Sequence, residues 1–322
     1  MEYRNLGRTG LKVSELCLGT MQFGWTADET TSHEILSTAF ENGINFIDTA
    51  DIYSRWVDGN PGGVSEAIIG DWLQQSGYER SKVILATKVR GVTGEGPNDE
   101  GLSRAHIMHE VENSLRRLKT DYIDLYQTHW YDENTPIEET LSAMDDLIRQ
   151  GKVRYIGCSN YPAWRLMQAL WCADRDNVNG YDCIQPHYSL VHRKEFEQEL
   201  ADVCRTYGIG VIPYSPLGGG FLTGKYRKDG SEIDSQRAKG VKRYFTENNW
   251  LLLDKMEEIG QKNSGKTISQ VALAWLLSDP LISSPIIGPR TIDQLQDNLG
   301  AVGFRLSADE KKILDDASST AH

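Results

Sequence analysis

The alternation of two kinds of segment constrains the fold of this 322-residue chain more than any other feature. Short apolar runs rich in β-branched residues alternate with amphipathic stretches along most of the sequence. The runs span residues 15–20, 44–50, 83–89, 122–129, 153–160, 183–188, 209–217 and 284–290. Strands that alternate with helices pair in parallel, and eight such repeats are typical of a closed barrel. We therefore predict an α/β fold, a (β/α)8 TIM barrel, in which residues 1–322 form a single domain.

The amphipathic stretches have the spacing and the end signals of helices. Residues 30–43 have one apolar face, made of Ile35, Leu36, Ala39 and Phe40, and Gly43 supplies a C-terminal stop. Further helices are predicted at 103–120, at 135–151, from Pro162 onward, at 246–263, at 267–277 and at 305–317.

Two segments depart from the repeat. Residues 2–14 predict an N-terminal β-hairpin that turns at Gly7–Gly10. Residues 218–244, after the seventh strand, form a long loop rich in glycine and lysine, and loops of that length inside a compact domain are usually functional lids. The helices at 246–263 and 267–277 are then additions before the eighth strand.

Charge and cysteine usage exclude several classes of partner. The formal net charge of −12 disfavours binding to nucleic acid and to anionic membranes. No apolar run is long enough to span a bilayer, and the first residues carry no secretory leader. The five cysteines form no CxxC pair and no zinc-like spacing. We therefore expect a cytoplasmic protein with free thiols and no metal site.

Reactive side chains gather where the predicted strands end. Asp48, Lys88 and His129 follow the second, third and fourth strands, and Tyr53 lies in the loop after Asp48. The later strands are followed by Ser159, Asn160, Gln185, Tyr214, Ser215, Gly288 and Arg290. In a barrel these strand ends share one rim, and barrel enzymes carry out their chemistry there.

Asp48, Tyr53, Lys88 and His129 suit the protonation of an alkoxide as it forms. A tyrosine with a pKa near its ordinary value of about 10 is protonated at neutral pH. We expect the Lys88 ammonium to lower the pKa of Tyr53, and Asp48 to keep Lys88 charged and oriented. We expect His129 to hydrogen-bond the substrate carbonyl oxygen that Tyr53 protonates. The sequence has no nucleophile elbow and no metal-ligand cluster, so hydrolysis fits less well.

Six stretches, in order and each at its expected strand, make the chain similar to the aldo-keto reductase superfamily over nearly its whole length. They are GINFIDTADIYS (43–54), LATKV (85–89), DLYQTHW (124–130), KVRYIGCSNY (152–161), VIPYSPLGGGFLTGKY (211–226) and PIIGPRTIDQLQDNLGA (285–301). The chain most resembles the bacterial branch related to potassium-channel β subunits and sugar-aldehyde reductases. The resemblance implies a catalytic tetrad at Asp48, Tyr53, Lys88 and His129. Channel β subunits usually have asparagine at the position of His129, which favours an active enzyme.

The resemblance also implies a site for NADP(H) without a GxGxxG loop. Ser159, Asn160 and Gln185 would bind the nicotinamide carboxamide, and Tyr214 would stack on the nicotinamide ring. Gly19, Thr20 and Met21 would line the pocket below the ring. The pyrophosphate would lie on Ser215, Leu217, Gly219 and Lys225. The 2′-phosphate end would involve Gly288, Arg290 and Gln294, with Asp297 and Asn298 as the adenine-binding pair.

The 2′-phosphate end departs from the family pattern. Many members have lysine where this chain has Gly288, and Gln294 replaces another frequent cation. Arg290 remains, and an arginine beside free helix N–H groups can bind a phosphate. We therefore expect NADPH as the cofactor, with NADH also possible.

The family points to reduction of a small-molecule aldehyde or ketone, with Trp25, Trp56, Trp130 and Tyr131 as candidates for lining the substrate pocket. Two other functions stay open at this point. One is a nucleotide-sensing regulatory subunit like the channel β proteins, and the other is a barrel lyase or isomerase that uses no nicotinamide. The substrate, the physiological direction and the oligomeric state are not specified by the sequence.

Overall fold

The eight predicted strands are present and parallel in the described part of the chain. The structure is a computed structural model that describes residues 1–226, 228 and 238–319. Within these residues one sheet has the order β10-β3-β4-β5-β6-β7-β8-β9. Its strands are β3 (Cys17–Gly19), β4 (Phe46–Asp48), β5 (Ile84–Val89), β6 (Ile123–Thr128), β7 (Val153–Ser159), β8 (Cys183–Gln185), β9 (Gly210–Val211) and β10 (Ile286–Ile287). Each strand lies within one of the predicted runs.

The two edges of this sheet meet. Val211 of β9 forms a parallel bridge with Ile282. The backbone N–H of Ile286 in β10 donates to the carbonyl of Pro213 over 2.9 Å. The sheet therefore curls round on itself, and the predicted (β/α)8 barrel is confirmed.

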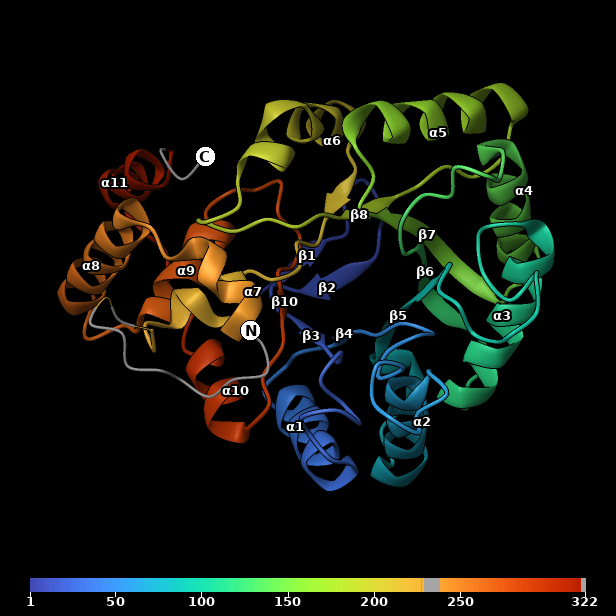
Figure 1. The fold of residues 1–322 in the computed structure, drawn as a ribbon, viewed down its shortest axis with the longest axis horizontal. Helices are drawn as coiled ribbons and strands as arrows, with labels where there is room; N and C mark the ends of the chain where they lie inside the picture. Colours follow the sequence, from blue (N-terminus) through green and yellow to red (C-terminus); the bar gives the residue numbers. More distant parts are fainter. Residues whose placement is uncertain (227, 229–237, 320–322) are drawn as a thin grey trace.

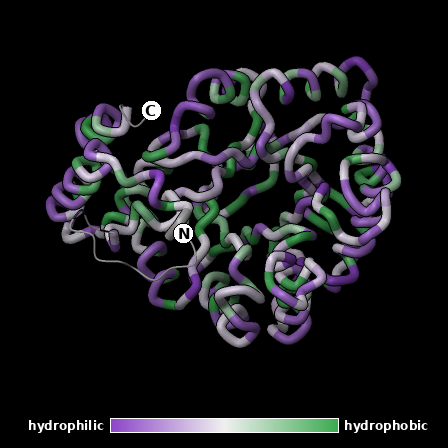
Figure 2. The backbone as a smooth tube through the Cα atoms, in the orientation of Figure 1, coloured by the Kyte–Doolittle hydropathy of each residue, from purple (hydrophilic) through white to green (hydrophobic). Residues whose placement is uncertain are grey.

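Helices surround the sheet (Figure 1). They are α1 (Glu29–Glu41), α2 (Val64–Ser76), α3 (Arg104–Leu118), α4 (Ile137–Arg149), α5 (Ala163–Asp176), α6 (Ala201–Tyr207), α7 (Ala238–Val241), α8 (Glu247–Lys262), α9 (Ile268–Leu277), α10 (Ile292–Leu299) and α11 (Ala308–Ser318). Helix α1 buries Ile35, Leu36 and Ala39 as predicted, whereas Phe40 is only partly buried and packs against the core. Hydrophobic residues lie mainly toward the strands, and hydrophilic residues lie mainly on the outer helices (Figure 2).

The N-terminal hairpin closes one end of the barrel. Strands β1 (Tyr3–Asn5) and β2 (Lys12–Ser14) pair antiparallel, as predicted. Leu6 and Val13 are fully buried in one cluster with Phe46 and Ile84, which lie at the start of β4 and β5. The hairpin thus covers the N-terminal ends of the strands and leaves the opposite rim as the open end among the described residues.

Two strands are shorter than their predicted runs because proline interrupts them. β9 ends before Pro213, and β10 lies between Pro285 and Pro289. Proline has no backbone N–H for the sheet ladder, so the chain leaves the sheet at these points.

The segment predicted as a lid loop is described only in part. Gly218–Thr223 forms short 3₁₀ turns and α7 lies at 238–241. Residues 227 and 229–237 lie outside the described residues. Across the described ranges, no helix combines the length and the apolar character needed to cross a membrane.

Candidate active site

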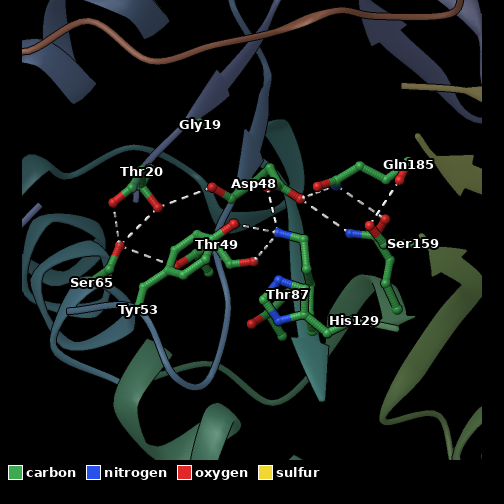
Figure 3. A network of polar contacts seen from close by, with 12 residues as sticks. Gly19, Thr20, Asp48, Thr49, Tyr53, Ser65, Thr87, His129, Ser159 and Gln185 are labelled. Carbon is green, nitrogen blue, oxygen red and sulfur yellow. Dashed lines mark hydrogen bonds and ion pairs between the residues drawn. The ribbon is translucent and has the colours of Figure 1, made fainter. Parts of the chain in front are cut away.

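Four predicted catalytic side chains meet at the open rim. Asp48 is the last residue of β4, Lys88 is the penultimate residue of β5, and His129 directly follows β6. Tyr53 comes from the loop after β4. In the register of the sheet Asp48 lies opposite Ala86, so Lys88 lies one side-chain pair nearer the rim on the neighbouring strand. The side chains of Asp48, Tyr53 and His129 lie close together at this end of the strands (Figure 3).

The Lys88 ammonium makes three hydrogen bonds. Its Nζ donates to Asp48 Oδ2 at 2.6 Å, to the Thr49 carbonyl at 2.8 Å and to Tyr53 Oη at 2.9 Å. Lys88 is fully buried. Burial alone would lower the pKa of Lys88, but Asp48 and Tyr53 outweigh it and raise that pKa overall. Lys88 is therefore a fixed cation beneath the tyrosine, with no proton to give up at neutral pH.

Asp48 is held by two glutamines on its other oxygen. Oδ1 accepts from Gln127 Nε2 at 3.1 Å and from Gln185 Nε2 at 2.9 Å. The sequence reasoning missed Gln127, although it lies two positions before His129 on β6, where alternate side chains share a face. Gln185 was expected to bind nicotinamide; here its amide nitrogen also bonds to Asp48. These contacts fix the carboxylate that orients Lys88.

Tyr53 is protonated across the physiological range, but not with the lowered pKa that the sequence suggested. Burial raises the pKa of Tyr53, and the nearby Lys88 offsets only part of that rise. Because Tyr53 Oη accepts a hydrogen bond from Lys88, its own proton is free to point elsewhere. The arrangement suits a proton donor whose tyrosinate product lies beside a cation.

His129 is a neutral ring in this site. Burial, followed by the positive charges of Lys88 and Arg90, lowers the pKa of His129 well below its ordinary value. Its ring centroid lies 6.0 Å from that of Tyr53. Among the described residues, no group bonds to its buried Nδ1. The ring also lines the cavity described below, so a neutral imidazole at this place can hydrogen-bond a ligand oxygen.

A cavity of about 570 Å³ opens over these residues. Asp48, Tyr53 and His129 line it, whereas Lys88 lies behind them. All the expected cofactor-binding residues also line it: Gly19, Thr20, Met21, Ser159, Asn160, Gln185, Tyr214, Ser215, Leu217, Gly219, Lys225, Gly288, Arg290, Gln294, Asp297 and Asn298. The volume is within the range typical of small-molecule and cofactor sites.

Backbone conformations that non-glycine residues rarely adopt gather at this rim. Ser54, Arg90, Asn160 and Ser215 have positive φ, and they account for four of the seven such residues in the described ranges. Each follows a barrel strand closely, and Asn160 and Ser215 line the cavity. Such conformations concentrate at functional sites because surrounding contacts must hold them in place.

Glycines shape the wall of the cavity at two places. A Cβ on Gly19 would lie 2.5 Å from Ile286 Cγ2 on the neighbouring strand β10, so this position has no room for a side chain unless Ile286 moves. A Cβ on Gly220 would lie 3.2 Å from Lys225 Nζ. Glycine therefore leaves open backbone next to a lysine, which fits a pyrophosphate.

The far end of the cavity carries one cation among several neutral and acidic groups. Arg290 lies just before α10, and among the described residues its guanidinium has no hydrogen-bonding or ion-pair partner. Gln294 accepts from the Arg290 backbone N–H at 2.9 Å. Asp297 accepts from the hydroxyl of Thr267, the N-cap of α9, at 2.8 Å. Arg290 is thus available to an anionic ligand.

The four aromatic candidates for the substrate pocket lie in three places. Trp130 lines the cavity and packs on His129, with ring centroids 4.3 Å apart. Trp25 and Trp56 pack edge to face beside Tyr53. Tyr131 packs against Tyr161 and does not line the cavity. The described residues contain no cluster of three or more His, Cys, Asp or Glu suited to a metal ion.

Comparison with known proteins gives a consistent result. Residues 15–319 match the model of the Aldo/keto reductase family. The chain is 44% identical over 320 residues to the Bacillus subtilis (strain 168) protein named "Uncharacterized oxidoreductase YrpG", covering 98% of this chain and 95% of that protein. It is 38% identical over 309 residues to an Arabidopsis thaliana protein named "Probable voltage-gated potassium channel subunit beta", covering 94% and 91%. It is 34% identical over 346 residues to "Aldo-keto reductase NECHADRAFT_45914" of Fusarium vanettenii, covering 98% and 90%.

Proposed function

This chain belongs to the aldo/keto reductase family, and we propose that it reduces an aldehyde or ketone to an alcohol with NADPH and with Tyr53 as the proton donor. The observation that carries the proposal is the contact between Tyr53 Oη and Lys88 Nζ at 2.9 Å, at the wall of a cavity lined by the residues expected to bind the cofactor.

Each residue of the tetrad has one task in this reaction. NADPH, when bound, supplies the hydride that reduces the carbonyl carbon. Tyr53 gives its hydroxyl proton to the carbonyl oxygen as negative charge develops there. Lys88 stabilises the resulting tyrosinate, Asp48 keeps Lys88 charged and oriented, and neutral His129 hydrogen-bonds the oxygen.

The preference for NADPH rests on Arg290. We expect Arg290→Ala to raise the Kd for NADPH by about 10- to 100-fold, because hydrogen bonds to charged groups contribute about 1.5–3 kcal/mol. The Kd for NADH, which lacks the 2′-phosphate, is expected to change less than about threefold. Fluorescence titration with both cofactors measures the difference. An equal loss of affinity for both cofactors would show that Arg290 does not recognise the 2′-phosphate.

A matched variant adds a cation at the same end of the cavity. A Cβ on Gly288 would lie 3.5 Å from Gln22 Oε1, an ordinary van der Waals distance. Gly288→Lys is therefore tolerated sterically and is expected to tighten NADPH binding without tightening NADH binding.

The pH dependence follows from the three shifted groups. The pKa values of Tyr53 and Lys88 are raised and that of His129 is lowered. None of these groups changes charge between about pH 7 and pH 9, so kcat/KM for a non-ionising carbonyl should be flat there. Loss of activity is expected only as Tyr53 ionises, above its ordinary pKa. A steady fall centred near pH 8 would contradict this assignment.

The screen that tests the function follows NADPH oxidation with aldehydes, ketoses and methylglyoxal, and repeats it with NADH. Repeated turnover on at least one carbonyl supports the reductase. The similarity to the Arabidopsis thaliana channel β protein favours a second candidate, a nucleotide-sensing subunit. That candidate predicts a burst of one NADPH oxidised per chain and no further turnover.

A further inference from the structure

Three aromatic rings are stacked in a column at the wall of the cavity. The ring centroids of His187 and Tyr214 are 5.0 Å apart, with 14° between the ring planes. The ring of His192 stacks on that of His187, with centroids 3.8 Å apart and 17° between the planes. Tyr214 alone of the three lines the cavity. The two histidines therefore back the ring that faces the ligand space.

The main chain sets the positions of these rings. Tyr214 forms a parallel bridge with His187 beyond the ends of β8 and β9, and its N–H donates to the Pro186 carbonyl at 2.9 Å. Ser189 and His192 exchange backbone hydrogen bonds of 3.1 and 2.9 Å, which folds His192 back over His187. The column is thus part of the fold and does not depend on exposed side chains meeting by chance.

Tyr214 is fixed at two points. Its hydroxyl donates to Asn160 Oδ1 at 2.9 Å, and the amide of Asn160 donates to the His129 carbonyl at 3.0 Å. Contact with His187 covers one face of the ring. The hydroxyl bond alone would allow the ring to rotate about its long axis, whereas the stack fixes its plane.

His187 is a neutral member of the column. Burial, with smaller contributions from His192 and Arg243, lowers the pKa of His187 to about 3. No described group bonds to its buried Nε2. The ring therefore contributes a flat surface without a charge, so it would not repel the cationic ring of an oxidised nicotinamide cofactor.

We propose that His187, backed by His192, is a positioning residue that holds the plane of Tyr214 for stacking against the cofactor's nicotinamide ring. This inference rests on the proposed function. Neither histidine lines the cavity, so both act through Tyr214.

The test separates the nicotinamide end of the cofactor from the adenosine end. His187→Leu fills similar space but has no ring plane, and His187→Phe keeps a plane. The probes are NADPH and adenosine 2′,5′-bisphosphate, which has no nicotinamide. An aromatic pair contributes about 0.5–1.5 kcal/mol beyond its buried area, so H187L should bind NADPH roughly 2- to 13-fold more weakly. H187L should bind the bisphosphate like the wild type, and H187F should recover most of the lost NADPH affinity.

His33→Leu is the matched control, because His33 lies on α1 and bonds to the Ile68 carbonyl, away from the column. It should leave both affinities unchanged. Wild-type NADPH affinity in H187L, an equal loss for both probes, or a loss in H187F as large as in H187L would each overturn the inference. If the wild type binds the bisphosphate but not NADPH, the proposed function itself fails, and the inference fails with it.

Discussion

Replacing Tyr53 with phenylalanine is expected to lower kcat for carbonyl reduction by about 10²–10⁴-fold, the usual contribution of a general acid. The hydroxyl is the only part removed, and it is the group that Lys88 contacts at 2.9 Å. The Kd for NADPH should stay within about twofold, since the phenyl ring keeps the shape of the cavity wall. Steady-state kinetics with a fluorescence titration measures both quantities.

Tyr78→Phe serves as the matched control. The Tyr78 hydroxyl bonds to Glu41 on the outer surface, at 3.0 Å. The same chemical change there should leave kcat as it is. Reduction by Y53F at the wild-type rate would show that Tyr53 is not the proton donor. A large loss of NADPH affinity in Y53F would show that Tyr53 has a structural role instead.

Replacing Arg117 with methionine is expected to lower the free energy of unfolding by about 3–5 kcal/mol, because it leaves two buried carboxylates without their positively charged partner. Arg117 Nε donates to Glu66 Oε2 at 2.6 Å, and Nη2 donates to Glu110 Oε1 at 2.5 Å. Both carboxylates are fully buried between α2 and α3. Urea unfolding followed by circular dichroism gives the change.

Two further variants test that explanation. Adding Glu110→Gln to the Arg117→Met variant removes one of the two unpaired charges, so part of the lost stability should return. Arg104→Met breaks a pair with Asp146 whose two side chains are 46% and 37% exposed, and should cost less than about 1 kcal/mol. Equal destabilisation by R104M and R117M would mean that burial of the carboxylates is not the cause.

The sequence predicts the barrel well because its strands are buried on both faces and read as continuous apolar runs. Helix α1, the N-terminal hairpin and the two helices before β10 were also predicted. Helices α2 and α6 were not. Helix α2 begins at Val64, and its N-cap residue Gly63 has positive φ and gives no side-chain cap, so a usual start signal is missing. Helix α6 follows a π-helical stretch at Phe196–Leu200, which breaks the regular helical spacing.

The sequence predicted which residues lie at the candidate site better than it predicted which atoms contact one another. Asp48, Lys88 and His129 could be placed on one rim because parallel strands end there together. The direction in which the pKa of Tyr53 shifts could not be predicted, because burial of the ring and proximity to Lys88 act in opposite directions. The contacts of Gln127 with Asp48 and of His187 with Tyr214 depend on sheet register, which sequence patterns define only loosely.

In the proposed reaction, the carbonyl carbon receives a hydride from the nicotinamide ring while Tyr53 protonates the oxygen. The most direct measurement uses NADPH labelled with deuterium at both C4 positions and the best carbonyl from the screen, with mass spectrometry and NMR of the alcohol. We predict one deuterium per product molecule, at the former carbonyl carbon, and a rate of product formation that Tyr53→Phe lowers at least a hundredfold. An unlabelled alcohol, or labelled alcohol formed equally fast by the variant, would contradict this mechanism.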